Sequence, residues 1–256
     1  MLSQLNSYAL EMIRRYQKLN IYNQKVNTPY HINNVGNNVI KKLLKDGGVP
    51  DEQAKNIYQM YKDRKAPFGW YRGKGTPEEI EQSVIELANL GKIDIDGATS
   101  VGIEEFMKLF GLGVDCSGFV FNTLSYAFEK IGKKEEFVNS LAWPEDKKTV
   151  FYAGAHVFAG DNHSVIQPPE LQALDIVLKH IDTNYYHIAM IVEDNGEMYL
   201  AQSDIDCYPS GINLSKIDKT KGNAPFTYES TFGQDWNLQL QEGIIECRRL
   251  PSSLLE

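Results

Sequence analysis

A cysteine stands between an aspartate and a serine in the segment DCSGFV, residues 115–120. Apolar residues follow it at helical spacing, at Val120, Leu124, Ala127, Phe128 and Ile131. This pattern predicts a helix that begins at Cys116. A thiol at a helix N-terminus is easily ionised, and the backbone N–H groups there can stabilise an oxyanion. Cys116 is therefore a candidate nucleophile; the competing interpretation is a small buried cysteine.

A nucleophilic cysteine also needs a base and a polar group that orients this base. His187 opens an otherwise apolar strand, HIAMIV, and follows the cysteine in the chain. The next strand, YLAQSD, offers Gln202, Ser203 or Asp204 as the orienting residue. We prefer Gln202, because a side-chain amide can accept a hydrogen bond from an imidazole N–H. If Ala201 faces inward instead, Gln202 points away and another group orients the base.

The elements before the cysteine are predicted to be helical. Their apolar spacing indicates helices over residues 5–16, 37–45, 51–63, 77–90 and 101–110. The fourth helix has a complete start signal, with Thr76 as N-cap, Pro77 at the first helical position and Glu79 closing a capping box. We therefore expect residues 1–110 to form a helical N-terminal extension.

The period changes from helix to strand after the cysteine-bearing helix. Strands are predicted over residues 173–180, 187–194, 197–204 and 242–250. Asn195-Gly196 is a strong signal for a tight hairpin between the second and third of them. Helices followed by an antiparallel sheet predict an α+β fold, with residues 111–256 as the domain that carries the site.

Composition excludes several classes of function. The 256-residue chain carries a net charge of −8, which argues against a nucleic-acid partner. No stretch is apolar enough to span a membrane, and the first residues lack the features of a secretory signal, so we expect a cytoplasmic protein without a membrane partner. Three widely spaced cysteines indicate neither a disulfide framework nor a zinc site. No metal or organic cofactor is expected, and the oligomeric state is left open.

Four segments occur in an order typical of one enzyme family. They are DCSGFV, LQALDIVL, HIAMIVEDNGEMYLAQS and IIECRRL. Together they resemble the NlpC family of cell-wall cysteine peptidases, which carry D-C-S-G-F/L-V, L-Q-P-G-D-L-V and H-V-G-I-Y segments and often a terminal Arg-Arg. PFGW, residues 67–70, resembles the P-Y-x-W segment of the same family. The resemblance implies a papain-like fold with the cysteine-bearing helix packed on an antiparallel sheet.

The resemblance also implies roles for individual residues. Cys116 would be the nucleophile and His187 the general base and acid, while Asp115 and Ser117 would shape the helix start and contact substrate. Substrate contacts are also expected from the upstream segment, at Phe68, Trp70 and Tyr71. Three departures stand out: Phe68 replaces a tyrosine, the third catalytic position holds no histidine, and LQALD lacks the Pro-Gly turn.

The function implied by the resemblance is that of a cysteine peptidase or amidase. The family's usual substrate is a peptidoglycan stem peptide, cut between D-glutamate and a diamino acid. A member without a signal sequence would trim recycled muropeptides, leave the cell by another route as a phage lysin or exported toxin, or hydrolyse a different amide. Two alternatives remain: a cysteine-dependent acyltransferase or thioesterase on the same scaffold, and a catalytically inactive binding module.

Overall fold

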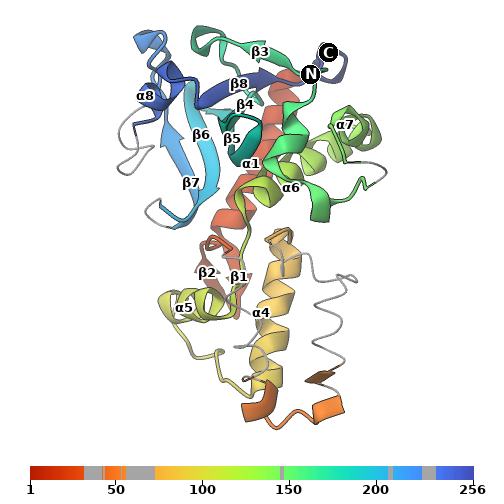
Figure 1. The fold of residues 1–256 in the computed structure, drawn as a ribbon. Coiled ribbons are helices and arrows are strands. Elements are labelled where there is room, and N and C mark those ends of the chain that lie inside the picture. Colours follow the sequence, from red (N-terminus) through yellow and green to blue (C-terminus); the bar gives the residue numbers. More distant parts are fainter. Residues whose placement is uncertain are drawn as a thin grey trace. The chain divides into compact units, whose positions relative to one another are not determined.

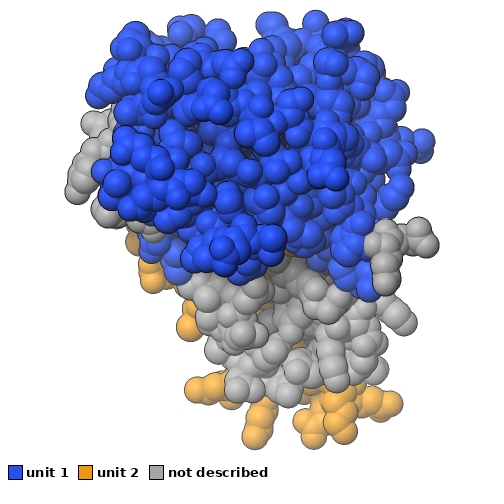
Figure 2. Space-filling view, turned by 45° about the horizontal axis from the view of Figure 1, so that its top comes forward, with its two compact units in different colours: residues 1–14, 116–256 blue, residues 15–115 orange. Residues whose placement is uncertain are grey.

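The computed structural model describes residues 1–31, 42, 44–52, 54–55, 73–144, 147–206, 210–226 and 235–256. Most of the helices predicted over 37–45 and 51–63 lies outside these residues, as do Phe68, Trp70, Tyr71 and Cys207. The chain divides into two compact units, which Figure 2 colours separately. Unit 1 comprises residues 1–14 and 116–256, and unit 2 comprises residues 15–115. The predicted division at 110/111 is near the end of unit 2, but the first 14 residues belong to unit 1.

Among its described residues, unit 2 includes two long helices and a small hairpin. The helices are α4 (Pro77–Gly91) and α5 (Ser100–Phe110), and the hairpin pairs β1 (Leu19–Ile21) with β2 (Gln24–Val26). Both helices match the sequence predictions closely. The hairpin was not predicted, because strands of three residues are too short to show a period.

The start of α4 follows from its capping residues. Thr76 Oγ1 accepts a hydrogen bond from the backbone N–H of Glu79 at 3.3 Å. Glu79 Oε2 in turn accepts one from the backbone N–H of Thr76 at 2.8 Å. Pro77 fills the first helical position, so its missing N–H leaves no donor unsatisfied. The predicted capping box is confirmed.

Unit 1 is built around a six-stranded antiparallel sheet with strand order β3-β8-β4-β5-β6-β7 (Figure 1). The strands are β3 (Ser164–Ile166), β4 (Ile176–Ile181), β5 (Asn184–Asp194), β6 (Glu197–Asp204), β7 (Gly211–Lys216) and β8 (Ile245–Arg249). The sheet and its helices confirm the α+β class. The sequence predicted four of these strands and missed β3 and β7, the two edges.

The helices of unit 1 are α1 (Leu2–Gln17), α6 (Cys116–Lys130), α7 (Lys134–Ser140), α8 (Trp236–Gln241) and α9 (Ser252–Leu255); the last residues of α1 belong to unit 2. Figure 1 shows α1 and α6 beside the sheet, and α6 packs against β5 and β6. Among these helices, α7, α8 and α9 were not predicted.

Both faces of the central strands are buried. Residues paired across strands share a face, so Val177, Ala189 and Cys247 lie together, and so do Ile191 and Leu200. These residues form one apolar cluster with Trp236 and other side chains. The alternating residues of β5, at Ile188, Met190 and Val192, are buried as well. Burial on both faces explains why these strands read as continuous apolar runs.

The hairpin between β5 and β6 has the geometry that its sequence predicts. Asn195 and Gly196 have φ values of 53° and 79°, and Asp194 pairs with Glu197 across the two-residue turn. Two consecutive positive φ values define a turn whose twist matches that of the strands. The turn therefore sets the register of β5 against β6, and with it the positions of His187 and Gln202.

Candidate functional site

Cys116 is the first residue of α6, as predicted. Cys116 is 7% exposed, and its thiol is not part of a disulfide. Helix α6 is buried along most of its length and packs against β5 and β6. The nucleophile candidate is therefore held at the start of a rigid, buried helix beside the two strands that carry His187 and Gln202.

The residues on either side of Cys116 are held by the protein. Lys74 Nζ lies 2.8 Å from both carboxylate oxygens of Asp115, and both side chains are largely buried. The backbone N–H of Asp115 also donates to the carbonyl of Gly73 at 2.9 Å. Ser117 is buried at the start of the helix. Asp115 thus anchors the chain just before the cysteine, and no signal near it in the sequence points to Lys74 as its partner.

His187 and Gln202 are joined by a hydrogen bond. His187 Nε2 lies 2.9 Å from Gln202 Oε1. The amide oxygen can only accept, so Nε2 carries the hydrogen and donates it. In the neutral ring this leaves a lone pair on Nδ1. The predicted pair is brought together in a form that leaves Nδ1 able to accept a proton.

Strand register explains why Gln202 meets His187. Ile191 pairs with Leu200, and steps of two residues along each strand bring His187 and Gln202 to the face that this pair shares. Ala201 pairs with Met190 and lies on the opposite face. The alternative in which Ala201 faces His187 is therefore excluded.

The same alternation separates the other two candidates for the orienting position. Ser203 lies on the face of Ala201, whereas Asp204 shares the face of Gln202. Asp204 Oδ2 is 3.7 Å from His187 Nε2. Gln202 is the direct partner of the imidazole, and Asp204 acts on it as a nearby charge.

The surroundings of His187 favour its neutral form. Burial lowers the pKa of His187, and the ammonium group of Lys179 lowers it further. The charges of Asp204 and Asp206 and the hydrogen bond to Gln202 raise this pKa, but burial has the largest effect. The net pKa lies below the ordinary value, so the ring is neutral near pH 7 and can act as a base.

This lowered pKa predicts a loss of stability at acid pH. The unfolded chain binds a proton at His187 near pH 6.5, whereas the folded protein binds it only at lower pH. The stabilising contribution is complete above about pH 6.5 and is lost as the pH falls through the folded pKa, at up to about 1.4 kcal/mol per pH unit. Urea unfolding of wild type and His187→Gln at pH 5 and 7.5 measures this contribution to the free energy of unfolding.

We expect the free energy of unfolding to fall less between these pH values in His187→Gln than in wild type. His163, whose pKa is also lowered by burial, contributes equally to both proteins and cancels in the comparison. Parallel losses in wild type and variant would contradict a neutral His187 in the folded protein.

Lys179 and Trp236 also contact His187, and both were missed in the sequence. Lys179 is the register partner of His187 on β4. The rings of Trp236 and His187 meet edge-on, with centroids 5.9 Å apart. A lysine inside the buried strand IVLKHI was the available signal, because lysine is rarely buried without a specific role.

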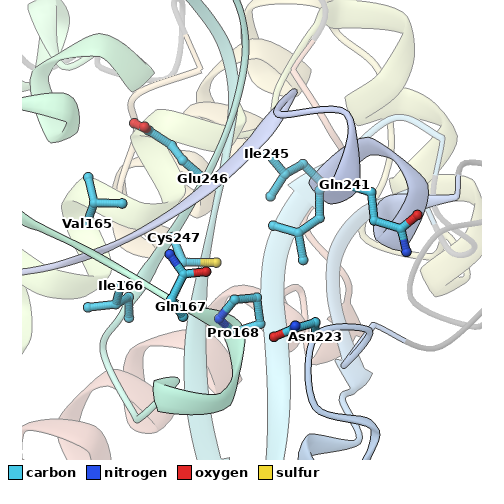
Figure 3. Close-up of a pocket in the computed structure, with 10 residues that line it drawn as sticks. Val165, Ile166, Gln167, Pro168, Asn223, Gln241, Ile245, Glu246 and Cys247 are labelled. Atoms are coloured by element: carbon cyan, nitrogen blue, oxygen red, sulfur yellow. The ribbon is translucent and has the colours of Figure 1, made fainter.

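Cys247 lies in a different part of unit 1. Burial raises the pKa of its thiol to about 12, and the charges of Asp175 and Glu246 act in the same direction. Its side chain lines a pocket of about 330 Å³ together with Ile166, Pro168 and Ile245 (Figure 3). None of the predicted site residues that the structure describes lines this pocket. Cys247 is a buried thiol that is not part of a disulfide.

Buried histidines elsewhere bond to backbone carbonyls. His31 Nδ1 lies 2.7 Å from the oxygen of Gly111, and His163 Nδ1 lies 2.8 Å from that of Phe158. Within the described parts of the chain, no three His, Cys, Asp or Glu side chains are grouped so that they could hold a metal ion. The helices described there include none that is both long and apolar enough to cross a bilayer.

Comparison with known proteins adds no relative to this geometry. No family model matches the chain, and no curated protein or solved structure is significantly similar to it. The interpretation of the site therefore depends on its own residues.

Proposed function

We propose that this protein is a cysteine hydrolase that cleaves an amide bond, with Cys116 as nucleophile and His187 as base. The observation that carries the proposal is the hydrogen bond between His187 and Gln202 on the two strands against which α6 packs. It presents an imidazole that is neutral and oriented by Gln202, on one of the two strands that α6 contacts.

The reaction would proceed in two stages. His187 Nδ1 takes the thiol proton, and the thiolate of Cys116 attacks the amide carbonyl. Backbone N–H groups at the start of α6 stabilise the oxyanion, and His187 returns the proton to the leaving amine. Water, deprotonated by His187, then releases the acyl group. The proposal requires Cys116 Sγ to come within hydrogen-bond reach of Nδ1.

A turn in unit 1 also supports the resemblance to the NlpC family. Leu174 stands where the L-Q-P-G-D motif has glycine, and its φ of 70° lies in the left-handed region that favours glycine. The following Asp175 forms a two-pronged ion pair with Arg249, the second arginine of the terminal Arg-Arg. The backbone shape of this motif is thus retained although its glycine is absent.

The proposed substrate class follows from this resemblance. It is a small peptidoglycan-derived peptide, cleaved between γ-D-glutamate and a diamino acid. Free acid and amine as products would identify a hydrolase, whereas transfer of the acyl group to an added amine or thiol would identify an acyltransferase. A binding module would bind the peptide and leave it intact.

The test is the pH dependence of iodoacetamide labelling, measured for each cysteine by peptide mass mapping. In wild type we expect Cys116 to react rapidly down to about pH 5–6, because transfer of the thiol proton to the neutral His187 ring forms a thiolate–imidazolium pair that persists below the ordinary thiol pKa of about 8.5. In His187→Ala we expect this reactivity at low pH to be lost. Cys247 is the internal control, since its raised pKa and burial keep it unlabelled in the folded protein.

An ordinary titration of Cys116 near pH 8.5, the same in both proteins, would count against the proposed dyad. So would a Cys116 that is not labelled at any pH. Labelling of Cys247 would show that the sample had unfolded, and the measurement would then be repeated at lower temperature.

A further inference from the structure

Lys179 is an unusual neighbour for the candidate base. It is 3% exposed and is paired with His187 across the β4–β5 ladder. Opposed side chains in an antiparallel pair lie within about 5.5 Å of each other at Cβ. A buried ammonium group is costly unless the protein compensates its charge. The fold nevertheless places this group beside His187.

Trp236 contacts both residues. Lys179 Nζ lies 3.9 Å from the centroid of the Trp236 ring, well within the range of a cation–π interaction. The His187 ring stands at 88° to the same indole, in an edge-on contact. Trp236 is almost fully buried. One indole therefore fixes the position of the ammonium group and limits the rotation of the imidazole.

The indole is itself held in place. Asp235 caps α8, because its Oδ1 accepts the backbone N–H of Leu238 at 2.9 Å. Phe226 packs against Trp236 with ring centroids 5.4 Å apart. Asn237 bonds to both the N–H and the carbonyl of Phe226, at 3.1 and 2.7 Å. The indole that contacts His187 is thus held by contacts with the segments on either side of it.

We propose that Lys179 and Trp236 act as positioning residues for His187, holding its ring toward Gln202 and keeping it unprotonated. The role of His187 as a catalytic base rests on the proposed function, but the contacts among the three side chains do not. Lys179 on β4 carries a positive charge. Its effect on His187 is opposite to that of the negative charges of Asp204 on β6 and Asp206 just after it. Without this cation, burial alone would oppose the two carboxylates, and the ring would be protonated more easily.

The first test is an NMR titration of the His187 ring in wild type, Lys179→Met and Lys216→Met. Methionine keeps an apolar stem over the indole and removes the charge. We expect the titration midpoint of His187 to rise in Lys179→Met. Lys216 is a matched control, because it is an exposed strand lysine that pairs with Glu197 on the surface. Its replacement is expected to leave the His187 midpoint unchanged.

Identical midpoints in all three proteins would overturn the role of Lys179. An equal shift in both variants would overturn it as well, since the effect would then be one of net charge. The NMR titration requires neither a substrate nor catalytic activity. If Cys116 shows no stabilised thiolate but Lys179→Met moves the His187 midpoint, the proposed function fails and this inference stands. If Cys116 shows a stabilised thiolate but Lys179→Met leaves the midpoint unchanged, only this inference is rejected.

The second test addresses Trp236. In Trp236→Phe the smaller ring loosens the contact with His187, so we expect the Nε2 proton to exchange with water roughly tenfold faster than in wild type, in line with a weakening of about 1.4 kcal/mol. Leu238→Ala on the exposed side of α8 is the control and is expected to leave this exchange unchanged. Equal exchange rates in wild type and Trp236→Phe would overturn the positioning role of the indole.

Discussion

Replacement of Cys116 by alanine is expected to abolish hydrolysis of γ-glutamyl-diamino acid peptides, with a fall of at least ~10³-fold in kcat/KM. The physical reason is that in the proposed reaction the thiolate of Cys116 forms the covalent intermediate, and alanine offers no nucleophile in its place. The measurement is the release of the free diamino acid, followed by chromatography, for wild type and variant at pH 7.

Cys247→Ala is the matched control for this substitution. Cys247 is also a buried thiol, but it lies on β8, two strands away from β5 in the sheet, and is not one of the residues of the proposed site. We expect this variant to lose some stability and to keep the wild-type kcat/KM. Equal activity of Cys116→Ala and wild type would contradict the proposed nucleophile, and far-UV circular dichroism would establish that both variants are folded.

Replacement of Arg249 by alanine is expected to reduce the free energy of unfolding by about 3–5 kcal/mol. Arg249 Nε and Nη2 each lie 2.9 Å from a carboxylate oxygen of Asp175, whose side chain is 1% exposed. Removing the guanidinium leaves this carboxylate buried without its ion-pair partner. Urea unfolding at pH 7 measures the loss.

Two further variants separate the buried pair from a general effect of charge. Arg14→Ala removes an ion pair with Asp194 of similar length, 2.8 Å, but more than half of the Arg14 side chain is exposed. Such surface pairs contribute about 0–1 kcal/mol. The double variant Asp175→Asn, Arg249→Met removes both charges together, so we expect it to recover much of the loss. A loss in Arg249→Ala no larger than in Arg14→Ala would contradict the structural role of this ion pair.

Local features of the sequence were sufficient to predict several helices and strands. The capping box at Thr76 and Glu79 predicted the start of α4, and the Asn195-Gly196 turn predicted the β5–β6 hairpin. The helix that begins at Cys116 was predicted from the spacing of its apolar residues. These signals are strong because each depends on hydrogen bonds or side-chain contacts within a few residues of the chain.

Predictions were weaker where strands were short or lay at the edges of the sheet. The strands β3 and β7 are edges, and β3 has only three residues, too few for an alternating pattern to appear. The strand that carries His187 begins three residues earlier than predicted, at Asn184, because its first residues are polar and exposed. Pairing with β4 continues past the end of the apolar pattern of β5, and this pairing makes the first polar residues part of the strand.

By itself, the sequence determined the α+β class, the position of Cys116 at a helix start and the identity of His187 and Gln202 as candidates. Only the tertiary structure decided that Gln202 faces His187 and that Ala201 and Ser203 do not, because this depends on the register of β5 and β6. Lys179 lies next to His187 in the sheet, and Trp236 reaches it from a helix 49 residues further along the chain. Neither contact leaves a local pattern, since strand pairing creates the first and packing of α8 on the sheet creates the second.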